Sequence, residues 1–448
     1  DSVKGGAKFY SSKRATYSGE FLDLDAEGTL ADFSAFYGKE VTDLFDGEYT
    51  GLYRLGVIID NQAMLAELQR AMNGDSSFFE GFATDPSSAK VSGEDSFEFK
   101  EDILAGYLMA TARFGDAQII GGLRVESTRN DISAYVLDEV QGERFTTDKS
   151  DFVNVLPSIH LNYALNRNTK VRAAIWTSFA RPDIARMTSA REYSYDIDPD
   201  GDGEENPTSD WVLIGIEQGN PDLKPMKAIN YDLSIERYNG DTGAYSLGLF
   251  YKDIENFLFR SASSNIRDGT AGANIGPDGV TISMPNNGKW AEVYGVEMSA
   301  QQIFYWLPGA LSGLGASVNL TLQHSEAETG ISWHPAGYTL PLMETPEAIA
   351  NVQLFWQYSG WEAYAAYSYQ SEFLEGIQDF GNNPYEQDYE FVDLNVRRKL
   401  WGGATASLQV QNLFDNHTYW YTAGSSTGSS RAYIKNGRSI SLGLTYVF

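Results

Sequence analysis

The sequence contains no cysteine and is poor in histidine and in basic residues. Without cysteine among its 448 residues, disulfide frameworks, thiolate metal sites and cysteine nucleophiles are excluded. Only 33 Lys and Arg stand against 61 Asp and Glu, a net charge of −28, so the clustered cations that neutralise nucleic-acid phosphates are missing. The four histidines are far apart, and no pair has the spacing of metal ligands: His160, His324, His334 and His417.

Long apolar runs are missing as well. No stretch reaches the roughly 18 consecutive apolar residues that a transmembrane helix needs. The first residues, Asp1 to Lys4, lack the basic start and apolar run of a signal peptide, so we expect either numbering from a processed end or a missing start. No Ser-His-Asp order, glycine-rich phosphate loop or close carboxylate pair stands out. The sequence therefore does not predict an enzyme.

The sequence does contain strict alternation of apolar and polar residues. Near the C-terminus, Ile440, Leu442 and Leu444 alternate with Ser439, Ser441 and small residues, which places the two sets on opposite faces of a strand. The pattern recurs in about 14 segments, with Asn, Gln, Ser, Thr and charged residues on the second face. The segments lie near residues 2–14, 97–113, 117–130, 147–165, 169–181, 227–238, 243–258, 289–305, 314–325, 347–358, 360–373, 387–399, 402–412 and 437–448.

Aromatic residues crowd the ends of the apolar face. Aromatics make up 13% of the chain, too many for a disordered acidic protein. A membrane barrel needs lipid-facing apolar residues, a hydrated or plugged lumen, and aromatic girdles at both interfaces. Strands cross a bilayer only as a closed barrel, because an open edge leaves backbone groups unpaired in hydrocarbon. We predict an all-β fold, a transmembrane antiparallel β-barrel of about 14 strands with long extracellular loops.

The connections between the predicted strands alternate between short and long. The short ones, such as 114–116, 239–242 and 359–360, are rich in Asn, Asp and Gly, as tight hairpins require. This alternation is expected when one set of turns faces the periplasm and the other faces the outside. The long connections are 16–96, 131–146, 182–226, 260–288, 326–345, 374–386 and 413–436.

Several segments resemble the barrel of TonB-dependent outer-membrane receptors. Gly219-Asn220-Pro221-Asp222-Leu223-Lys224-Pro225 is similar to a strand-entry motif of that family, and Gln411-Asn412-Leu413-Phe414-Asp415 is similar to a segment near its end. Further similar segments are 155–163, 171–183, 250–257, 293–297 and 437–448. The resemblance covers essentially the whole chain, in the family's order.

The resemblance implies a protein larger than residues 1–448. The family has a 22-stranded barrel, an N-terminal plug domain and a preceding segment that contacts TonB. No plug pattern occurs here, so we expect residues 1–448 to form the C-terminal part of such a barrel. We also expect it to pair with the missing strands and plug, on the same or a separate chain, and to reach the TonB complex through the plug. Its other expected partners are outer-membrane lipid and lipopolysaccharide.

Two long connections are acidic and are expected to lie outside the cell. Connection 16–96 carries 16 Asp and Glu against 4 Lys and Arg between Glu20 and Asp95. Within it, residues 61–73 have apolar residues at helical spacing and end in Asn73-Gly74, which predicts a short helix. This helix either covers the pore and docks a partner, or packs the loop onto its neighbours.

The second acidic loop, 182–226, contains a possible calcium site. Asp196, Asp198, Asp200 and Asp202 alternate with other residues, and Gly201 takes the sixth position, as in the first half of a calcium-binding loop. The twelfth position holds Pro207 rather than the usual bidentate Glu. The pattern predicts Ca²⁺ as a possible ligand, with an acidic, solvated loop tip as the alternative. No other cofactor is required.

Aromatic side chains in two further loops are candidate substrate contacts. Flat rings with nearby hydroxyls are typical of carbohydrate sites, and packing within the loops or the girdle is the alternative. The candidate residues are Trp333, His334, Tyr338, Tyr419, Trp420, Tyr421 and Arg431. Acidic loops disfavour anionic cargo such as catecholate-bound iron. Conversely, Arg124, Arg172 and Arg397 fall on lumen-facing positions and could serve the plug or an anion.

We therefore expect TonB-dependent active transport of a scarce nutrient across the bacterial outer membrane. The candidate residues favour a carbohydrate over a ferric siderophore. One alternative is a passive, porin-like channel. Another is a surface adhesin or partner-docking barrel whose acidic loops bind a surface lipoprotein or the calcium-rich cell surface.

Overall fold

The computed structural model divides into two units, residues 1–15 with 97–448, and residues 16–96. Residues 1–16, 19–20, 37–40, 57–59, 63, 66, 70, 90–91, 97–138, 140, 144–201, 206–240, 242–266, 275, 279–331, 334–335, 337–377, 383–422 and 429–447 are described. Within this part of the chain, no helix is long and apolar enough to span a membrane.

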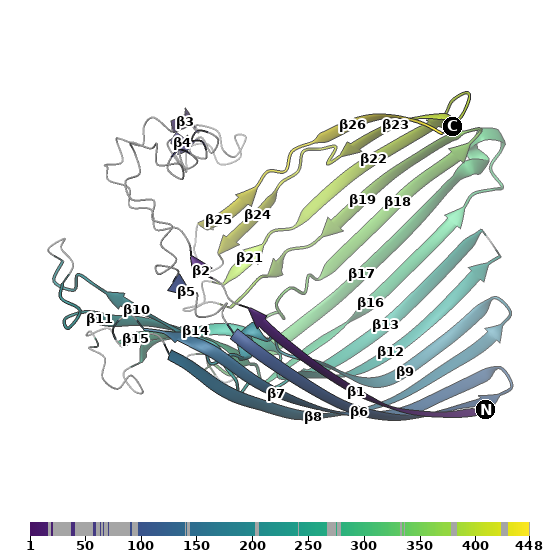
Figure 1. Cartoon of the computed structure of the whole chain (residues 1–448). Helices are drawn as coiled ribbons and strands as arrows, with labels where there is room; N and C mark the ends of the chain where they lie inside the picture. Colours follow the sequence, from purple (N-terminus) through teal and green to yellow (C-terminus); the bar gives the residue numbers. More distant parts are fainter. Residues whose placement is uncertain are drawn as a thin grey trace. The chain divides into compact units, whose positions relative to one another are not determined.

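The first unit is built on one sheet of eighteen strands (Figure 1). Four short strands extend it at the long connections: β10 (Arg191–Asp196), β11 (Val212–Gln218), β14 (Leu258–Ile266) and β15 (Val280–Asn287). The other fourteen are β1 (Ser2–Thr16), β6 (Phe97–Phe114), β7 (Ala117–Leu137), β8 (Arg144–Asn166), β9 (Thr169–Ala180), β12 (Met226–Asn239), β13 (Gly243–Glu255), β16 (Trp290–Ile303), β17 (Leu314–Glu328), β18 (Ala348–Tyr358), β19 (Trp361–Gln370), β22 (Tyr389–Lys399), β23 (Ala404–Gln411) and β26 (Ser439–Tyr446).

Each of these strands pairs antiparallel with the next one in the chain. β1 pairs with β6, and β26 pairs with β23. In the middle of the sheet, all thirteen residues from Lys227 to Asn239 of β12 are in register with Glu255 to Gly243 of β13. All eight residues of β26 are exposed. The predicted fourteen-strand antiparallel sheet is confirmed.

The faces of the sheet are reversed relative to those of a soluble protein. Ile229 and Leu233 of β12 are 41% and 49% exposed, whereas the polar Asn230 between them is 3% exposed. Asn154 of β8 is likewise fully buried. A soluble sandwich would bury the aliphatic rows in a core, so this arrangement fits a sheet whose outer face meets lipid.

Aromatic side chains border this apolar face at both ends, as expected of interfacial girdles. Towards the long connections, Tyr231, Tyr251 and Tyr294 lie opposite one another on adjacent strands. Beside the short turns, the exposed aromatic residues are Phe114, Tyr163, Tyr238, Tyr305, Trp306, Tyr358, Trp361 and Trp401.

One of the two-residue turns shows how composition sets a hairpin. Ser359 and Gly360 join β18 to β19 with φ angles of 47° and 82°. Two positive φ values match the twist of paired strands, and glycine adopts such values without strain. A short 3₁₀ helix, η3 (Gly309–Gly313), lies in the connection between β16 and β17.

The long connections contain more structure than the sequence indicated. β7 continues to Leu137, and β8 already starts at Arg144. The expected loop 131–146 is therefore mostly strand. Connections 182–226 and 260–288 contain β10, β11 and most of β14 and β15, while connections 374–386 and 413–436 contribute to a separate four-stranded sheet. Its strands are β20 (Phe373–Leu374), β21 (Pro384–Glu386), β24 (Thr418–Thr422) and β25 (Ser429–Ile434). These strands are two to six residues long and rich in Ser, Thr and Tyr, so they lack the lipid-facing rows that mark the spanning strands.

The largest hydrophobic cluster lies among these connections. Phe257 and Phe259 pack with residues from β13, β16, β17 and the later connections: Ile254, Ala291, Val293, Ala327, Leu340, Leu374 and Ile377. A second cluster joins Phe99 and Ile132 to Met187 and Leu223. Burial of apolar surface therefore orders the connections themselves.

The second unit contains two short strand pairs, β2 (Gly19–Glu20) with β5 (Lys90–Val91) and β3 (Tyr37–Glu40) with β4 (Val57–Ile59). In the predicted helix 61–73, the described residues Ala63, Ala66 and Arg70 are helical. The apolar residues on which that prediction rests lie outside the described residues.

Candidate functional site

A pocket of about 990 Å³ lies among the long connections. Its wall is apolar where Phe257, Phe259 and Ile377 of the largest cluster reach it. Leu342 and Met343 add to that wall from the connection between β17 and β18. Five separate connections contribute to its lining, which is partly apolar and partly charged. Its volume and mixed lining are those of a small-molecule site.

Three arginines from three different connections line the pocket: Arg186, Arg260 and Arg431. Arg260 forms an ion pair with Glu217 (Nη2 to Oε1, 2.5 Å) and donates to Ser283 Oγ at 3.1 Å. Arg431 pairs with Glu375 (Nη1 to Oε2, 3.2 Å). Within the described part of the chain, the guanidinium of Arg186 has no ion-pair partner. It is the cation most available to an anionic ligand.

Arg186 is carried by the segment 182–190, which we call the strap. The strap contains the 3₁₀ helix η2 (Ala185–Met187). Met187 is 2% exposed and packs in the second cluster, and the carbonyl of Arg186 accepts from the Asn220 amide at 2.8 Å. The amide of Gly219 donates to Ala190 O at 3.1 Å. The motif 219–225 therefore anchors the strap against the start of β12.

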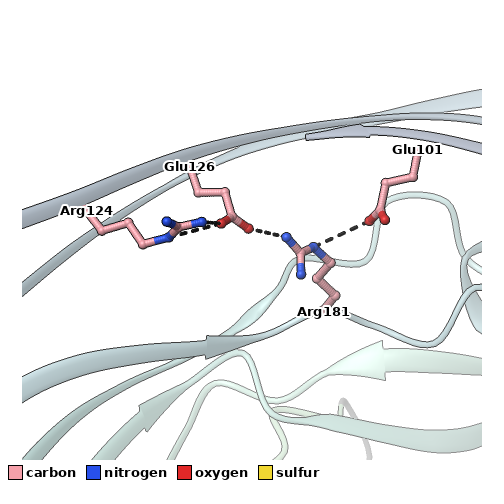
Figure 2. Close-up of polar contacts among 4 residues, drawn as sticks. All are labelled: Glu101, Arg124, Glu126 and Arg181. Atoms are coloured by element: carbon pink, nitrogen blue, oxygen red, sulfur yellow. Dashed lines mark hydrogen bonds and ion pairs between the residues drawn. The ribbon is translucent and has the colours of Figure 1, made fainter. Parts of the chain in front are cut away.

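The strap begins beside an ion network on the inner face of the sheet (Figure 2). Arg181 contacts Glu126 of β7 and lies 3.5 Å from Glu101 of β6 (Nε to Oε1). Arg124 contacts the other oxygen of Glu126, which is 5% exposed. The network links Arg181, which follows β9 and directly precedes the strap, to β6 and β7.

The lumen-facing positions expected for three arginines are confirmed by the registers. Arg124 lies two residues from Glu126 on the same face of β7, and it pairs with that carboxylate. Arg172 pairs with Glu236 (Nε to Oε1, 2.9 Å). Arg397 lies opposite Glu362 on β19. Arg124 and Arg172 are already neutralised by carboxylates. A contact of these arginines with a plug or an anion stays a prediction.

The aromatic candidates fall into two groups, and most lie away from the pocket wall. Trp333 lies outside the described residues. His334 is half-buried, with its ring 4.4 Å from that of Tyr338 and Nδ1 3.1 Å from Thr329 Oγ1, and burial lowers its pKa. Of the six candidate residues that the structure describes, Arg431 is the one that lines the 990 Å³ pocket.

Tyr419, Trp420 and Tyr421 form much of strand β24. The Tyr421 hydroxyl donates to Glu372 Oε2 at 3.0 Å, and its ring stacks on Tyr385 at 5.5 Å. Burial and this hydrogen bond raise the pKa of Tyr421 to about 12. These contacts hold two connections together, the one between β19 and β22 and the one between β23 and β26. A role in cargo binding stays a prediction.

Sequence reasoning missed Arg186 and Arg260. Neither lies in a recognisable motif, and the acidic composition of the loops argued against a site for an anion. Their position became apparent only from the fold, because residues 186, 260 and 431 come from three separate connections.

The aspartates of the possible calcium loop cap a turn. Asp196 Oδ1 accepts from the Asp198 amide at 3.2 Å, and Asp198 Oδ1 accepts from Gly201 at 3.0 Å. Asp202 lies outside the described residues, and among those described no group of acidic or histidine side chains is arranged to hold a metal. Calcium binding stays a prediction.

A variant with Asp198→Asn and Asp200→Asn tests that prediction. If calcium binds, the ion should slow proteolysis at 196–205 in the unchanged protein, and the variant should lose this protection, because Ca²⁺ prefers charged oxygens. Limited proteolysis with calcium or chelator measures the effect. Identical cleavage of the unchanged protein under both conditions would remove the idea.

Comparison with known proteins places this fold. A family model described as the β-barrel of TonB-dependent receptor-like proteins matches residues 2–413. The chain belongs to the TonB-dependent receptor β-barrel family. It is a segment of a β-barrel of the bacterial outer membrane, and members of this family are transporters that interact with TonB rather than enzymes.

Individual named proteins are similar to this chain at low sequence identity. The iron-regulated outer membrane virulence protein of Vibrio cholerae is 28% identical over 313 residues, covering 68% of this chain and 41% of that protein. The ferric citrate transporter FecA has a TM-score of 0.53 at 14% identity, covering 82% of this chain and 47% of that one. The ferric yersiniabactin uptake receptor FyuA of Yersinia pestis has a TM-score of 0.52 at 17% identity, covering 80% and 47%. The chain thus spans less than half the length of these proteins.

Proposed function

We propose that this chain supplies the wall and the cargo-gathering loops of a receptor that imports a scarce nutrient, an anionic ferric chelate, by TonB-dependent transport. The observation that carries the proposal is the pocket where Arg186, Arg260 and Arg431 converge over an apolar floor. Cations gathered on one wall attract an anion more strongly than a single cation in open water.

The pocket differs in charge from the chain around it. The whole sequence carries a net charge of −28, yet the pocket wall has three arginines against two carboxylates, Glu344 and Glu375. Glu217 pairs with Arg260 and Glu375 with Arg431, so the positive charge offered to a ligand is that of Arg186. The expectation that acidic loops disfavour an anion therefore does not extend to this pocket. Relatives named for iron regulation or ferric chelates point the same way, and they give carbohydrate cargo no support.

Binding to the purified protein tests the cargo. Ferric citrate, a ferric catecholate and a maltodextrin are titrated separately against tryptophan fluorescence. We expect a ferric chelate to bind, and Arg186→Gln to weaken binding roughly tenfold, the cost of about one charge-assisted hydrogen bond. Arg191→Gln is the matched control, because Arg191 is exposed on β10, in the same connection, and does not line the pocket. Binding of maltodextrin alone would exclude the ferric chelate, and equal losses in the two variants would exclude the pocket as its site.

Energy coupling is tested separately. Uptake of the bound chelate by cells should disappear when TonB is deleted, whereas binding to the surface should remain. A passive channel would keep transporting without TonB and would conduct ions in planar bilayers. An adhesin would bind its partner and transport nothing.

A further inference from the structure

Six charged residues form a regular grid on the outer face of β6, β7 and β8. In the registers, Lys100 lies opposite Asp131, which lies opposite Lys149, while Asp102 lies opposite Arg129, which lies opposite Asp151. Charges thus alternate both along and across the strands. Three ion pairs join them: Lys100–Asp102 at 3.0 Å, Arg129–Asp151 at 3.6 Å and Lys149–Asp131 at 3.8 Å.

The charged grid lies directly beyond the lipid-facing apolar band. The next row towards the membrane is Leu104, Ser127 and Val153, and the one after it contains Val125 and Val155. Leu104 and Val153 are 61% and 56% exposed. The grid is on the side of the long connections, which face outward from the cell in this fold. It therefore sits where the headgroups of the outer leaflet begin.

The corresponding position on other strands has a different charge. On β13, β16 and β17, the next residues of the outer face beyond Tyr251 and Tyr294, towards the long connections, are Asp253, Glu292 and Glu326. These three carboxylates lie side by side. An anionic headgroup is repelled there. The grid, by contrast, contains three cations, Lys100, Arg129 and Lys149. Neighbouring β1 adds Lys13, which pairs with Glu98 at 3.4 Å.

The ion pairs of the grid are easily exchanged for other partners. The side chains of Arg129 and Lys149 are 71% and 76% exposed. Exposed pairs of this kind contribute only about 0–1 kcal/mol to stability. A phosphate approaching from the headgroup layer can replace a carboxylate partner at little cost.

We propose that the charged grid docks a phosphate-bearing glycolipid of the outer leaflet. Its cations bind the headgroup phosphates, and its carboxylates bind the divalent cations that accompany those phosphates. A surface of alternating charge is complementary to such a layer of phosphates and cations, whereas a surface of one sign is complementary to only half of it. The lipid chains continue onto the apolar rows below.

Two triple variants test this proposal. Lys100→Gln with Arg129→Gln and Lys149→Gln removes the cations, and Asp102→Asn with Asp131→Asn and Asp151→Asn removes the carboxylates. Both break the same three ion pairs. Bis-phosphorylated lipid A and its dephosphorylated form are titrated in detergent against the protein purified from outer membranes, with bound lipid counted by native mass spectrometry.

We expect the cation variant to bind bis-phosphorylated lipid A at least roughly tenfold more weakly, since each cation near an anionic lipid surface contributes about 1 kcal/mol. In magnesium-free buffer, the carboxylate variant should bind it as tightly as the unchanged protein or more tightly. Neither change should affect the dephosphorylated form. Heat-modifiable migration in gels verifies that both variants remain folded.

Equal losses in the two variants would show that the grid only stabilises the sheet, and would overturn the proposal. Equally tight binding of phosphorylated and dephosphorylated lipid A would overturn it as well. So would binding of inorganic phosphate alone as tightly as the lipid, since the grid would then be a free-anion site. None of these outcomes depends on cargo binding.

Discussion

Replacing Gly219 with alanine is expected to detach the strap and to abolish cargo binding. An added Cβ would lie 2.2 Å from the backbone oxygen of Thr188, and Thr188 is 1% exposed, so the backbone has no room to shift. Forcing atoms into such packing costs about 3 kcal/mol. The strap positions Arg186 in the pocket through the Asn220 amide, so its displacement removes the available arginine.

Hydrogen exchange and chelate binding measure this effect together. Amides of 183–190 should exchange roughly a hundredfold faster, while amides of the spanning strands stay protected. Gly215→Ala is the matched control in the same connection, because its Cβ would meet Ser194 Cβ at an ordinary 3.4 Å. Unchanged exchange in the Gly219 variant would mean that the motif does not anchor the strap.

The spanning part of the fold could be predicted closely from the sequence. Predicted 227–238 became β12, Met226–Asn239, and predicted 97–113 became β6, Phe97–Phe114. This accuracy has a physical reason. Lipid on one side and a polar interior on the other impose a period of two along each spanning strand.

The connections and the pocket could not be predicted in the same way. Strands such as β10 and β24 pair in water with other connections, so their side chains carry no fixed alternation. The pocket depends on residues far apart in the sequence, such as Arg186 and Arg431, and nothing local links them. Composition even misled, because the net acidity of the loops hid the three arginines that gather on one wall.

The motifs that suggested the family have structural roles here. Asn412 adopts a left-handed φ of 51°, and its Nδ2 donates to Asn416 O at 2.9 Å and Gly437 O at 3.3 Å. Gly219 allows the close approach of Thr188. Both fix the backbone where a spanning strand meets a long connection, so they identify the family without naming a cargo.

Removing the carboxylate of Glu126 is expected to have the second large effect. Glu126→Leu leaves Arg124 and Arg181 without the buried charge that joins them (Figure 2). Breaking a fully buried ion pair by removing one partner costs about 3–5 kcal/mol, and the loss here should be smaller, because the side chains of Arg124 and Arg181 are 35% and 33% exposed and Arg181 keeps Glu101. Since Arg181 directly precedes the strap, faster amide exchange should appear first at 182–190 and then in the adjoining parts of β6 and β7.

A double-mutant cycle separates this network from general loss of packing. Replacing Arg181 with Met in the Glu126→Leu background should recover part of the lost protection, since it removes one of the two cations that faced Glu126. Asp151→Asn, on β8 and on the opposite face of the sheet, breaks an exposed pair and should change protection by less than about 1 kcal/mol. If the two losses simply add, Arg181 and Glu126 are not coupled, and the strap is held by Met187 and the Gly219 motif alone.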